Sequence, residues 1–536
     1  MSTTNRTARW SHAKHRWLAL IGGISLLVWG LSGLAHIAMV LFGPQQAQFM
    51  PPRVTVSLDG ARPIATTLAE HGIGQAAAVK TVAAPAGGVL WQVTQDPLAE
   101  RRYFSPADGR EIAGGDRAQA EFLARHFLAT DRAIASARLQ TRFDADYPWV
   151  NRLLPVWRLE FAGDDGLVAY VHTETSSLAA VNNTAKNRLQ AVFRVLHTWE
   201  WVPPGMEWLR VAAIGLMVSS LLALALTGIA MLVTVRRKKR LPGARGWHRI
   251  AGYVLAVPLI MFSGSGIWHL AQSALVPPQS NLAMGTRVDV ASGRWPVEAD
   301  WALIARGRDV ASVALVAGAQ GQPLYRIGLA PPKGTIGGGE HDHGADSAKP
   351  AHGMAGHDHA AMLAAQAKAL TTDAEIREAR FAGIRPDSPA IYIDAATGTL
   401  APAGDKDIAL ALARRFTGAP DSAVRQIELV TRFSHEYDFR NKRLPVWRID
   451  YGAPVSASLF VDPGAGVLVD RVADREKPER LVFSFVHKWN FLFPIGRLGL
   501  NAVVGAFVIA LLGFMAVLGL RMDLARRRAR HRRGGR

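Results

Sequence analysis

The 536-residue sequence predicts a membrane protein in which an internal duplication builds a four-helix transmembrane bundle with two α+β regions outside the membrane. Three observations lead to this fold class: four long apolar runs, a phrase that occurs twice, and basic residues gathered at the ends of the runs. The sequence contains no P-loop, no HExxH motif, no nucleophile elbow and no GxGxxG site at a strand–helix junction. It therefore gives no sign of the common hydrolase and dinucleotide-dependent classes.

The duplication is clearest around the phrase "LPVWR". Residues 141–161 align without a gap with residues 431–451, and ten of the 21 positions are identical. In the same register, at an offset of 290, "AVFRVLHTWEW" (191–201) aligns with "LVFSFVHKWNF" (481–491). A repeat of this extent indicates a duplicated structural unit.

Upstream the offset changes to 233, where "GLSGLAH" (30–36) aligns with "SGSGIWH" (263–269). About 55 extra residues therefore lie in the second half, between roughly 328 and 390. They include a His/Met-rich insert at about 335–365 that has no counterpart in the first half.

The four apolar runs are each long enough to cross a hydrocarbon layer of about 30 Å as a helix. We expect transmembrane helices at 17–41, 208–235, 250–273 and 496–520. The first run follows a charged segment, as in a signal peptide, but it has no clear small-residue cleavage site and matches an internal span. We expect it to be retained.

Charge predicts the orientation. Lys and Arg total four in 1–16, seven in 236–249 and eight in 521–536, and with Asp523 as the only acid these segments carry 18 of the net charge of +19. The positive-inside rule makes them cytoplasmic and leaves the nearly neutral regions 42–207 and 274–495 outside. Nucleic-acid binding is the rival interpretation of a pI near 10.6, but these basic residues flank membrane spans. The expected partner is the lipid bilayer, with no nucleic acid.

Each outer region is expected to be an α+β layer. The segments 116–129 and 405–416 repeat apolar residues at helical spacing, and each starts with an Asp that could cap the helix. The segments after them are rich in β-branched and aromatic residues bounded by Gly, Asp and Pro, which is typical of strands. We interpret "PVWR" as a folding element, in which Arg158 and Arg448 pair with Glu160 and Asp450 or meet an anion.

The paired "LPVWR" phrases, each followed by an "HTW" or "HKW" segment and a membrane span, resemble the PepSY-associated transmembrane family. The resemblance covers nearly the whole chain except the insert. It implies a bacterial inner-membrane protein with two periplasmic PepSY-type regions. The family includes haem-containing reductases of ferric siderophores, which implies haem b, two per chain, as the cofactor of an oxidoreductase. It also implies a ferric siderophore or another metal complex in the periplasm as the acceptor.

Six of the 17 histidines fall at duplicated positions. Neutral imidazole is a good axial ligand for haem iron, and an ionisable side chain near a span is costly unless it has a partner. The alternative is that they are interfacial anchors, which duplication copies as faithfully as ligands. The candidate haem ligands are His15, His36, His197, His248, His269 and His487.

The spacing within the first span places two of these histidines at opposite membrane faces. His15 and His36 are 21 residues apart, about 31 Å along a helix. We expect His15 to lie opposite His248 near the cytoplasm, while the other four compete at the outer face. The cysteine-free sequence excludes disulfides and covalently attached haem. With only short cytoplasmic segments, electrons must come from a cytoplasmic partner or a membrane quinol.

The insert is a separate candidate metal site. Imidazole with thioether suits copper, and imidazole with carboxylate suits zinc or nickel. The alternative is a tolerated flexible insertion. The candidate ligands are His341, His343, His352, Met354, His357 and His359.

Three functions remain open on the sequence. The leading hypothesis is a haem protein that passes electrons to a periplasmic ferric siderophore. The second is a haem-free, membrane-anchored binding or regulatory module that modulates peptidases. The third is a periplasmic copper- or metal-handling protein that acts through the insert.

Overall fold

The computed structural model of the chain describes residues 3–235, 243–276, 284–290, 304–305, 307–330, 379–384 and 388–534. The chain divides into two compact units. The helical unit comprises Met1–Gly43, Asn183–Pro278 and Arg475–Arg536, and the sheet unit comprises Pro44–Asn182 and Gln279–Asp474. Both halves of the sequence contribute to each unit.

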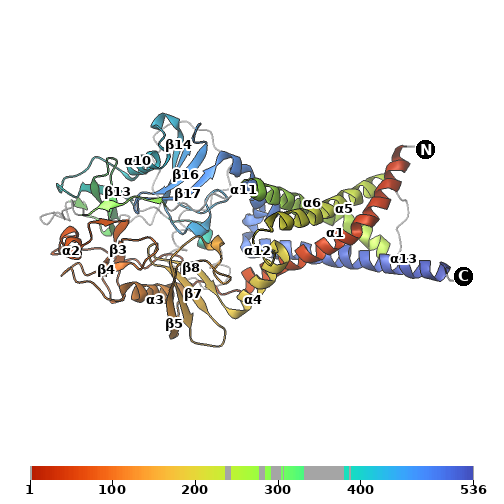
Figure 1. Cartoon of the computed structure of the whole chain (residues 1–536), viewed down its shortest axis with the longest axis horizontal. Coiled ribbons are helices and arrows are strands. Elements are labelled where there is room, and N and C mark those ends of the chain that lie inside the picture. The colour runs from red at the N-terminus through yellow and green to blue at the C-terminus, as the bar shows by residue number, and fades with distance from the viewer. Residues whose placement is uncertain are drawn as a thin grey trace. The chain divides into compact units, whose positions relative to one another are not determined.

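Four long helices form the helical unit (Figure 1). The first three are α1 (Thr3–Phe42), α5 (Glu207–Thr234) and α6 (Gly243–Leu275). The fourth is a composite of α12 (Gly496–Ala510), the π-helical η8 (Leu511–Val517) and α13 (Leu518–Gly534). All four are long and apolar enough to cross a membrane. Helices α1 and α13 continue into the flanking basic segments, because Lys and Arg are good helix formers.

The helices pack around a small apolar core. Helix α1 packs against α5 and α5 against α6, while the fourth helix contacts α1 and α6. Buried leucines come from every helix: Leu26, Leu221, Leu255, Leu259 and Leu511. A Cβ added at Gly22 would lie 3.0 Å from the Leu224 side chain on α5. Small residues allow this close approach of two helices.

Short helical connectors precede the second and fourth spans. In the first half, α4 (Thr184–Phe193) continues into the π-helical η2 (Arg194–Thr198). In the second half, α11 (Lys477–Val482) continues into the π-helical η6 (Phe483–His487), followed by the 3₁₀-helix η7 (Asn490–Ile495). Each connector carries one of the duplicated histidines.

In the described residues, the sheet unit contains four antiparallel sheets. A four-stranded sheet has the order β5-β6-β7-β8, and a five-stranded sheet has the order β14-β15-β16-β17-β9. The first consists of β5 (Ile134–Gln140), β6 (Val156–Phe161), β7 (Val168–His172) and β8 (Ser177–Asn182). The second consists of β14 (Val424–Val430), β15 (Val446–Tyr451), β16 (Ala457–Asp462), β17 (Val467–Ala473) and β9 (Met284–Gly285).

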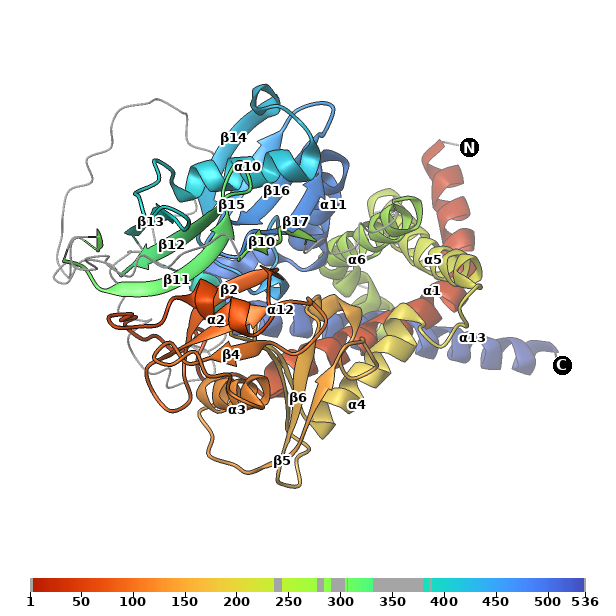
Figure 2. The same ribbon diagram turned by 60° about the vertical axis from the view of Figure 1, so that its left-hand side comes forward.

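The third sheet joins the two halves of the sequence. Its order is β13-β12-β11-β2-β3-β4, with β2 beside β11 (Figure 2). The strands are β2 (Ala78–Ala83), β3 (Val89–Thr94), β4 (Arg102–Phe104), β11 (Val310–Ala317), β12 (Pro323–Leu329) and β13 (Ser388–Asp394). The fourth sheet pairs β1 (Gln75–Ala76) with β10 (Val288–Asp289) and also crosses between the halves.

The two outer regions of the sequence thus share a sheet. Trp91 of the first half and Tyr325 of the second are buried in one core. Three short strands have an open edge and little apolar surface to bury, so two such sheets gain stability by pairing edge to edge. The two outer segments are therefore parts of one folded unit.

A helix packs on the four-stranded sheet and another on the five-stranded sheet, as expected for an α+β layer. These helices are α3 (Gly115–Leu128), against β6–β8, and α10 (Asp405–Thr417), against β15–β17. The expectation that an Asp caps each helix was wrong, because the N-cap residues are Gly114 and Gly404.

The two aspartates instead lie in the first turns and bond to the sheets. Asp116 accepts from the Tyr103 hydroxyl at 3.0 Å and from the Trp157 indole at 2.8 Å. Asp405 accepts from the Tyr392 hydroxyl at 2.6 Å and from Arg326 at 2.7 Å. A buried donor without an acceptor is costly, so these bonds outweigh a capping role.

A buried ion-pair cluster ties the two halves of the sheet unit together. The Glu174 carboxylate pairs with Arg443 of the other half and lies 3.8 Å from Lys80. Arg443 also donates to Asp462 at 3.1 Å. Burial by itself would raise the pKa of Glu174, but Arg443 and Lys80 hold it well below its usual range. The carboxylate is therefore charged at neutral pH.

We predict that Glu174→Gln destabilises the protein by about 3–5 kcal/mol at neutral pH, because it leaves buried cations without their partner. The folded-state pKa of Glu174 is lowered, so its contribution is complete above the unfolded-state pKa of about 4.3 and declines as the pH falls below it. Thermal unfolding of the detergent-solubilised variant and wild type, at pH 7 and at about pH 3.5, measures this.

The control is Glu70→Gln, which breaks an exposed pair with Arg62 and should cost less than about 1 kcal/mol. A Glu174→Gln variant that is as stable as wild type at pH 7, or whose deficit does not shrink in acid, contradicts the role of the cluster.

Candidate functional site

The structure brings His15 and His248 together. They lie on α1 and α6, and their ring centroids are 6.3 Å apart. His15 Nδ1 lies 3.0 Å from the Leu224 carbonyl oxygen and 3.2 Å from Thr227 Oγ1, and His248 Nδ1 lies 3.3 Å from the Phe514 carbonyl oxygen. A carbonyl oxygen only accepts, so Nδ1 carries the proton in both rings and Nε2 keeps its lone pair.

These two hydrogen bonds are equivalent under the sequence repeat. Leu224 and Phe514 are 290 positions apart, the offset of the second pair of spans, just as the two histidines differ by the 233 of the first pair. Phe514 lies in the π-helical segment η8. Short π-helical segments are frequent at functional sites. Their hydrogen bonds skip one residue more than those of an α-helix, which changes the carbonyls that are bonded within the helix.

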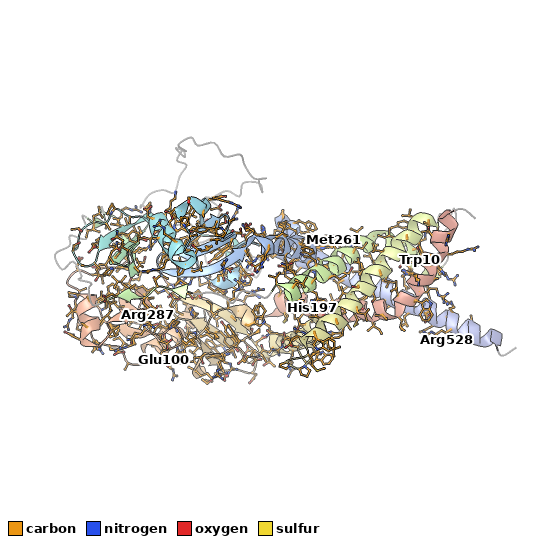
Figure 3. The ribbon with its side chains drawn as sticks, turned by 45° about the horizontal axis from the view of Figure 1, so that its top comes forward. Trp10, Glu100, His197, Met261, Arg287 and Arg528 are labelled. Atoms are coloured by element: carbon orange, nitrogen blue, oxygen red, sulfur yellow. The ribbon has the colours of Figure 1, made fainter. Side chains whose placement is uncertain are left out.

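A second histidine cluster lies at the opposite end of the helical unit. Figure 3 shows Trp10 of α1 near one end of the helices and His197 near the other. Phe193 of α4 contacts both His36, at 5.2 Å between ring centroids, and His197, at 4.5 Å. Ser32 of α1 lies 3.0 Å from His197 Nδ1 and donates its own hydroxyl proton to the Trp29 carbonyl. Ser32 Oγ is therefore an acceptor for Nδ1–H, and Nε2 of His197 keeps its lone pair.

The second half repeats this arrangement. Phe483 contacts both His269, at 4.4 Å between ring centroids, and His487, at 5.0 Å. Ser265 of α6 lies 3.0 Å from His487 Nδ1 and donates to the Met261 carbonyl at 2.5 Å. His487 thus has the same tautomer as His197. In addition, His269 Nδ1 bonds to a Glu479 carboxylate oxygen at 2.5 Å.

The backbone around His197 and His487 is irregular in the same way in both halves. Each lies in the last turn of a π-helical segment. The tryptophan two residues later has a positive φ, +53° at Trp199 and +55° at Trp489. Left-handed backbone is unfavourable for a bulky residue and is retained where the surroundings demand it, often at functional sites. Each indole stacks on the neighbouring span, Trp199 on Trp29 and Trp489 on Phe262.

The four outer histidines influence one another electrostatically. Burial, followed by the imidazoles of His487, His36 and His269, lowers the pKa of His197 to about 3. Burial likewise lowers the pKa of His487 to about 4, with His269 the strongest neighbouring contribution. Both rings are therefore neutral at physiological pH, which is the form that binds metal.

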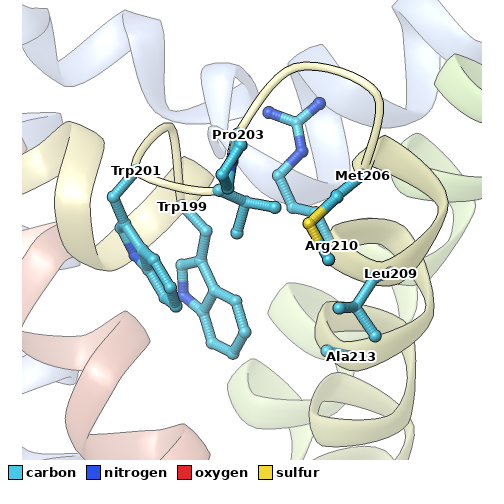
Figure 4. Close-up of a pocket in the computed structure, with 8 residues that line it drawn as sticks. Trp199, Trp201, Pro203, Met206, Leu209, Arg210 and Ala213 are labelled. Atoms are coloured by element: carbon cyan, nitrogen blue, oxygen red, sulfur yellow. The ribbon is translucent and has the colours of Figure 1, made fainter.

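A small apolar pocket adjoins this outer cluster. It has a volume of about 300 Å³, and the indoles of Trp199 and Trp201 form one wall (Figure 4). Arg210 contributes the charged group of its lining and donates to the Thr198 carbonyl at 3.5 Å. Trp199 is thus shared between the pocket and the contact with α1.

The arginines of the "PVWR" phrases are paired with carboxylates. Arg158 pairs with Glu160, and Arg448 donates to Asp450 at 2.9 Å and also pairs with Glu436. Of the two roles left open by the sequence, the structure shows the ion pair. The insert candidates His341, His343, His352, Met354, His357 and His359 lie outside the described residues.

The sequence interpretation missed the partners of the histidines. Ser32 and Ser265 lie four residues before His36 and His269 in aligned segments, so the repeated S-G-x-x-H pattern was visible. The carbonyls of Leu224 and Phe514 carry no sequence signal, because every residue has one. Glu479 stands where the first half has Leu189, and a difference between repeats does not by itself indicate function.

A comparison with protein families matches residues 13–527 to the model described as the PepSY-associated TM region. The chain belongs to this family. No curated protein matches the sequence. The family, together with the four apolar helices, identifies a membrane protein.

We predict that Ser32→Ala and Ser265→Ala each destabilise the helical unit by about 1–3 kcal/mol, because each leaves a buried imidazole N–H without an acceptor. Thermal unfolding in detergent measures the change. The matched control is Ser273→Ala, which removes an exposed hydroxyl that bonds to the His269 carbonyl within α6. An equal loss of stability in all three variants would show that the bonds to His197 and His487 contribute no more to stability than the exposed Ser273 bond.

Proposed function

We propose that the protein is an inner-membrane b-type haem protein that moves electrons to the periplasm and reduces a ferric siderophore or another ferric complex there, releasing the iron. The observation that carries this proposal is the contact between His15 and His248, with both Nδ1 atoms anchored on backbone carbonyls. A histidine that binds a metal through one ring nitrogen usually donates the N–H of the other to a carbonyl or carboxylate oxygen, and this bond fixes its tautomer.

The residues present fit haem. Two imidazoles that share one metal ion, each with a metal–nitrogen bond of about 2 Å, have ring centroids roughly 6 Å apart, and the separation of His15 and His248 is 6.3 Å. Neutral His pairs in helix bundles suit an electron carrier. On this proposal His15 and His248 hold the inner haem, and two of His36, His197, His269 and His487 hold the outer one.

Bound haem supplies one-electron chemistry, cycling its iron between the ferric and ferrous states. The chain's own residues hold the ligands in position and keep water away. The Leu224 and Phe514 carbonyls orient the inner pair, and Ser32 and Ser265 orient His197 and His487. The stacked aromatic rings around the outer histidines limit the rotation of the imidazoles.

His197 lies deeper in the bundle than the position of His36 at the end of the first span suggests for the outer site. His197 bonds to Ser32, one turn of α1 inside His36. Ser32 is 17 residues from His15, or about 26 Å along the helix axis, against about 31 Å for His36. The bond therefore shortens the distance between the two proposed sites.

The matched contacts also support an origin by internal duplication. Pairs of equivalent residues, such as Ser32 with His197 and Ser265 with His487, make the same contact at offsets of 233 and 290. The four-stranded β5–β8 sheet and the β14–β17 part of the five-stranded sheet run in the same order, each with a helix packed on it.

The test is the reduced-minus-oxidised absorption spectrum of the purified protein from haem-replete cells, with a pyridine haemochrome assay for haem per chain. We expect a b-type signal with two haems. The His15→Ala/His248→Ala double variant should lose one of them and keep the other, while Ser273→Ala, whose hydroxyl bonds to a backbone carbonyl and not to an imidazole, keeps both. A colourless wild-type protein would overturn the proposal and leave a membrane-anchored binding module.

The proposed orientation places both termini in the cytoplasm and the sheet unit in the periplasm. The chain has no cysteine, so a single introduced thiol reports its own location. We predict that Ser57→Cys, at an exposed position of the sheet unit, reacts with a membrane-impermeant maleimide in intact cells whose outer membrane is permeabilised. Arg528→Cys on α13 should react only after the inner membrane is lysed. The reverse pattern would invert the topology.

A further inference from the structure

The two outer histidine arrangements share their serine, phenylalanine and tryptophan residues, but they are not identical. His269 Nδ1 bonds to a Glu479 carboxylate oxygen at 2.5 Å. At the corresponding position, 290 residues earlier, the first half has the apolar Leu189.

The Glu479 carboxylate is well placed to act on His269. Its side chain is 16% exposed, whereas that of His269 is 46% exposed. Glu479 lies on α11, one helical turn before Phe483, whose ring stacks on the His269 ring at 4.4 Å between centroids and 23° between planes. The imidazole is thus fixed on one face by Phe483 and at Nδ1 by Glu479.

We infer that Glu479 is a positioning residue that strengthens His269 as an imidazole donor and lowers the midpoint potential of the haem bound there. This inference rests on the proposed haem function. A carboxylate that accepts a hydrogen bond from Nδ1 raises the basicity of the imidazole at Nε2, and a stronger imidazole donor favours the ferric state. The negative charge of the carboxylate acts in the same direction.

The carboxylate gives the outer haem a distinct electrostatic setting. His197 and His487 have neutral serine partners, Ser32 and Ser265, whereas His269 has the carboxylate of Glu479. A haem with a lower potential is the better reductant. If His269 is one of its ligands, the outer haem then passes an electron to a ferric acceptor more readily than it would without Glu479.

The test is a potentiometric titration of the haem absorption in Glu479→Gln and wild type. Gln has the same shape, and its carbonyl oxygen still accepts from Nδ1, but it carries no charge. We expect one haem component to shift to a more positive midpoint potential while the other stays in place. Glu479→Asp keeps the charge, so its midpoint potential should lie closer to that of wild type than the potential of Glu479→Gln does. The control is Glu200→Gln, which removes a half-exposed carboxylate from the first half and should leave both potentials unchanged.

A second variant covers the case in which Glu479→Gln loses haem. Leu189→Glu adds a carboxylate at the matching position of α4, and it should move the potential of the outer haem to a more negative value. Two haems with unchanged potentials in Glu479→Gln would overturn the role of Glu479 and leave the haem function standing. A wild-type protein without haem would overturn both.

Discussion

The structure depends on the need of every buried imidazole for a hydrogen-bond partner where water is scarce. Inside a bundle of apolar helices an N–H group without an acceptor costs free energy, and a charged ring costs more. The protein meets this need by turning Nδ1 of His15, His197, His248 and His487 toward an oxygen atom. The partly exposed His269 makes a similar bond to Glu479. The same hydrogen bond fixes the tautomer. It therefore stabilises the folded protein and also leaves the Nε2 lone pair free to bind a metal.

The inner and outer histidines use different kinds of hydrogen-bond acceptor. The inner pair uses backbone carbonyls of the neighbouring spans, one of them in a π-helical turn. The outer pair uses serine hydroxyls, whose own protons are occupied by carbonyls of the same helix. Irregular turns at η2, η6 and η8 are thus placed where a histidine needs a partner or a particular orientation.

In the sheet unit the two repeated halves of the sequence form a single folded body. Two three-stranded sheets pair at β2 and β11 and bury a common core, and Glu174 and Arg443 join the halves through a buried ion pair. The halves also differ at matched positions, as Glu479 and Leu189 do.

The sequence by itself determined the four apolar helices, the α+β character of the outer regions, the family and the six histidines worth examining, because hydrophobic periodicity and repetition are written directly in the residue order. It also suggested that His15 would face His248. Only the tertiary structure decided the acceptors of Nδ1, the sharing of one sheet by both halves and the contact of Glu479 with His269. Those contacts join residues 165 or more positions apart, and two of the acceptors are backbone carbonyls common to every residue. Local sequence carries no record of which carbonyl a distant imidazole will meet, since that is fixed by helix packing.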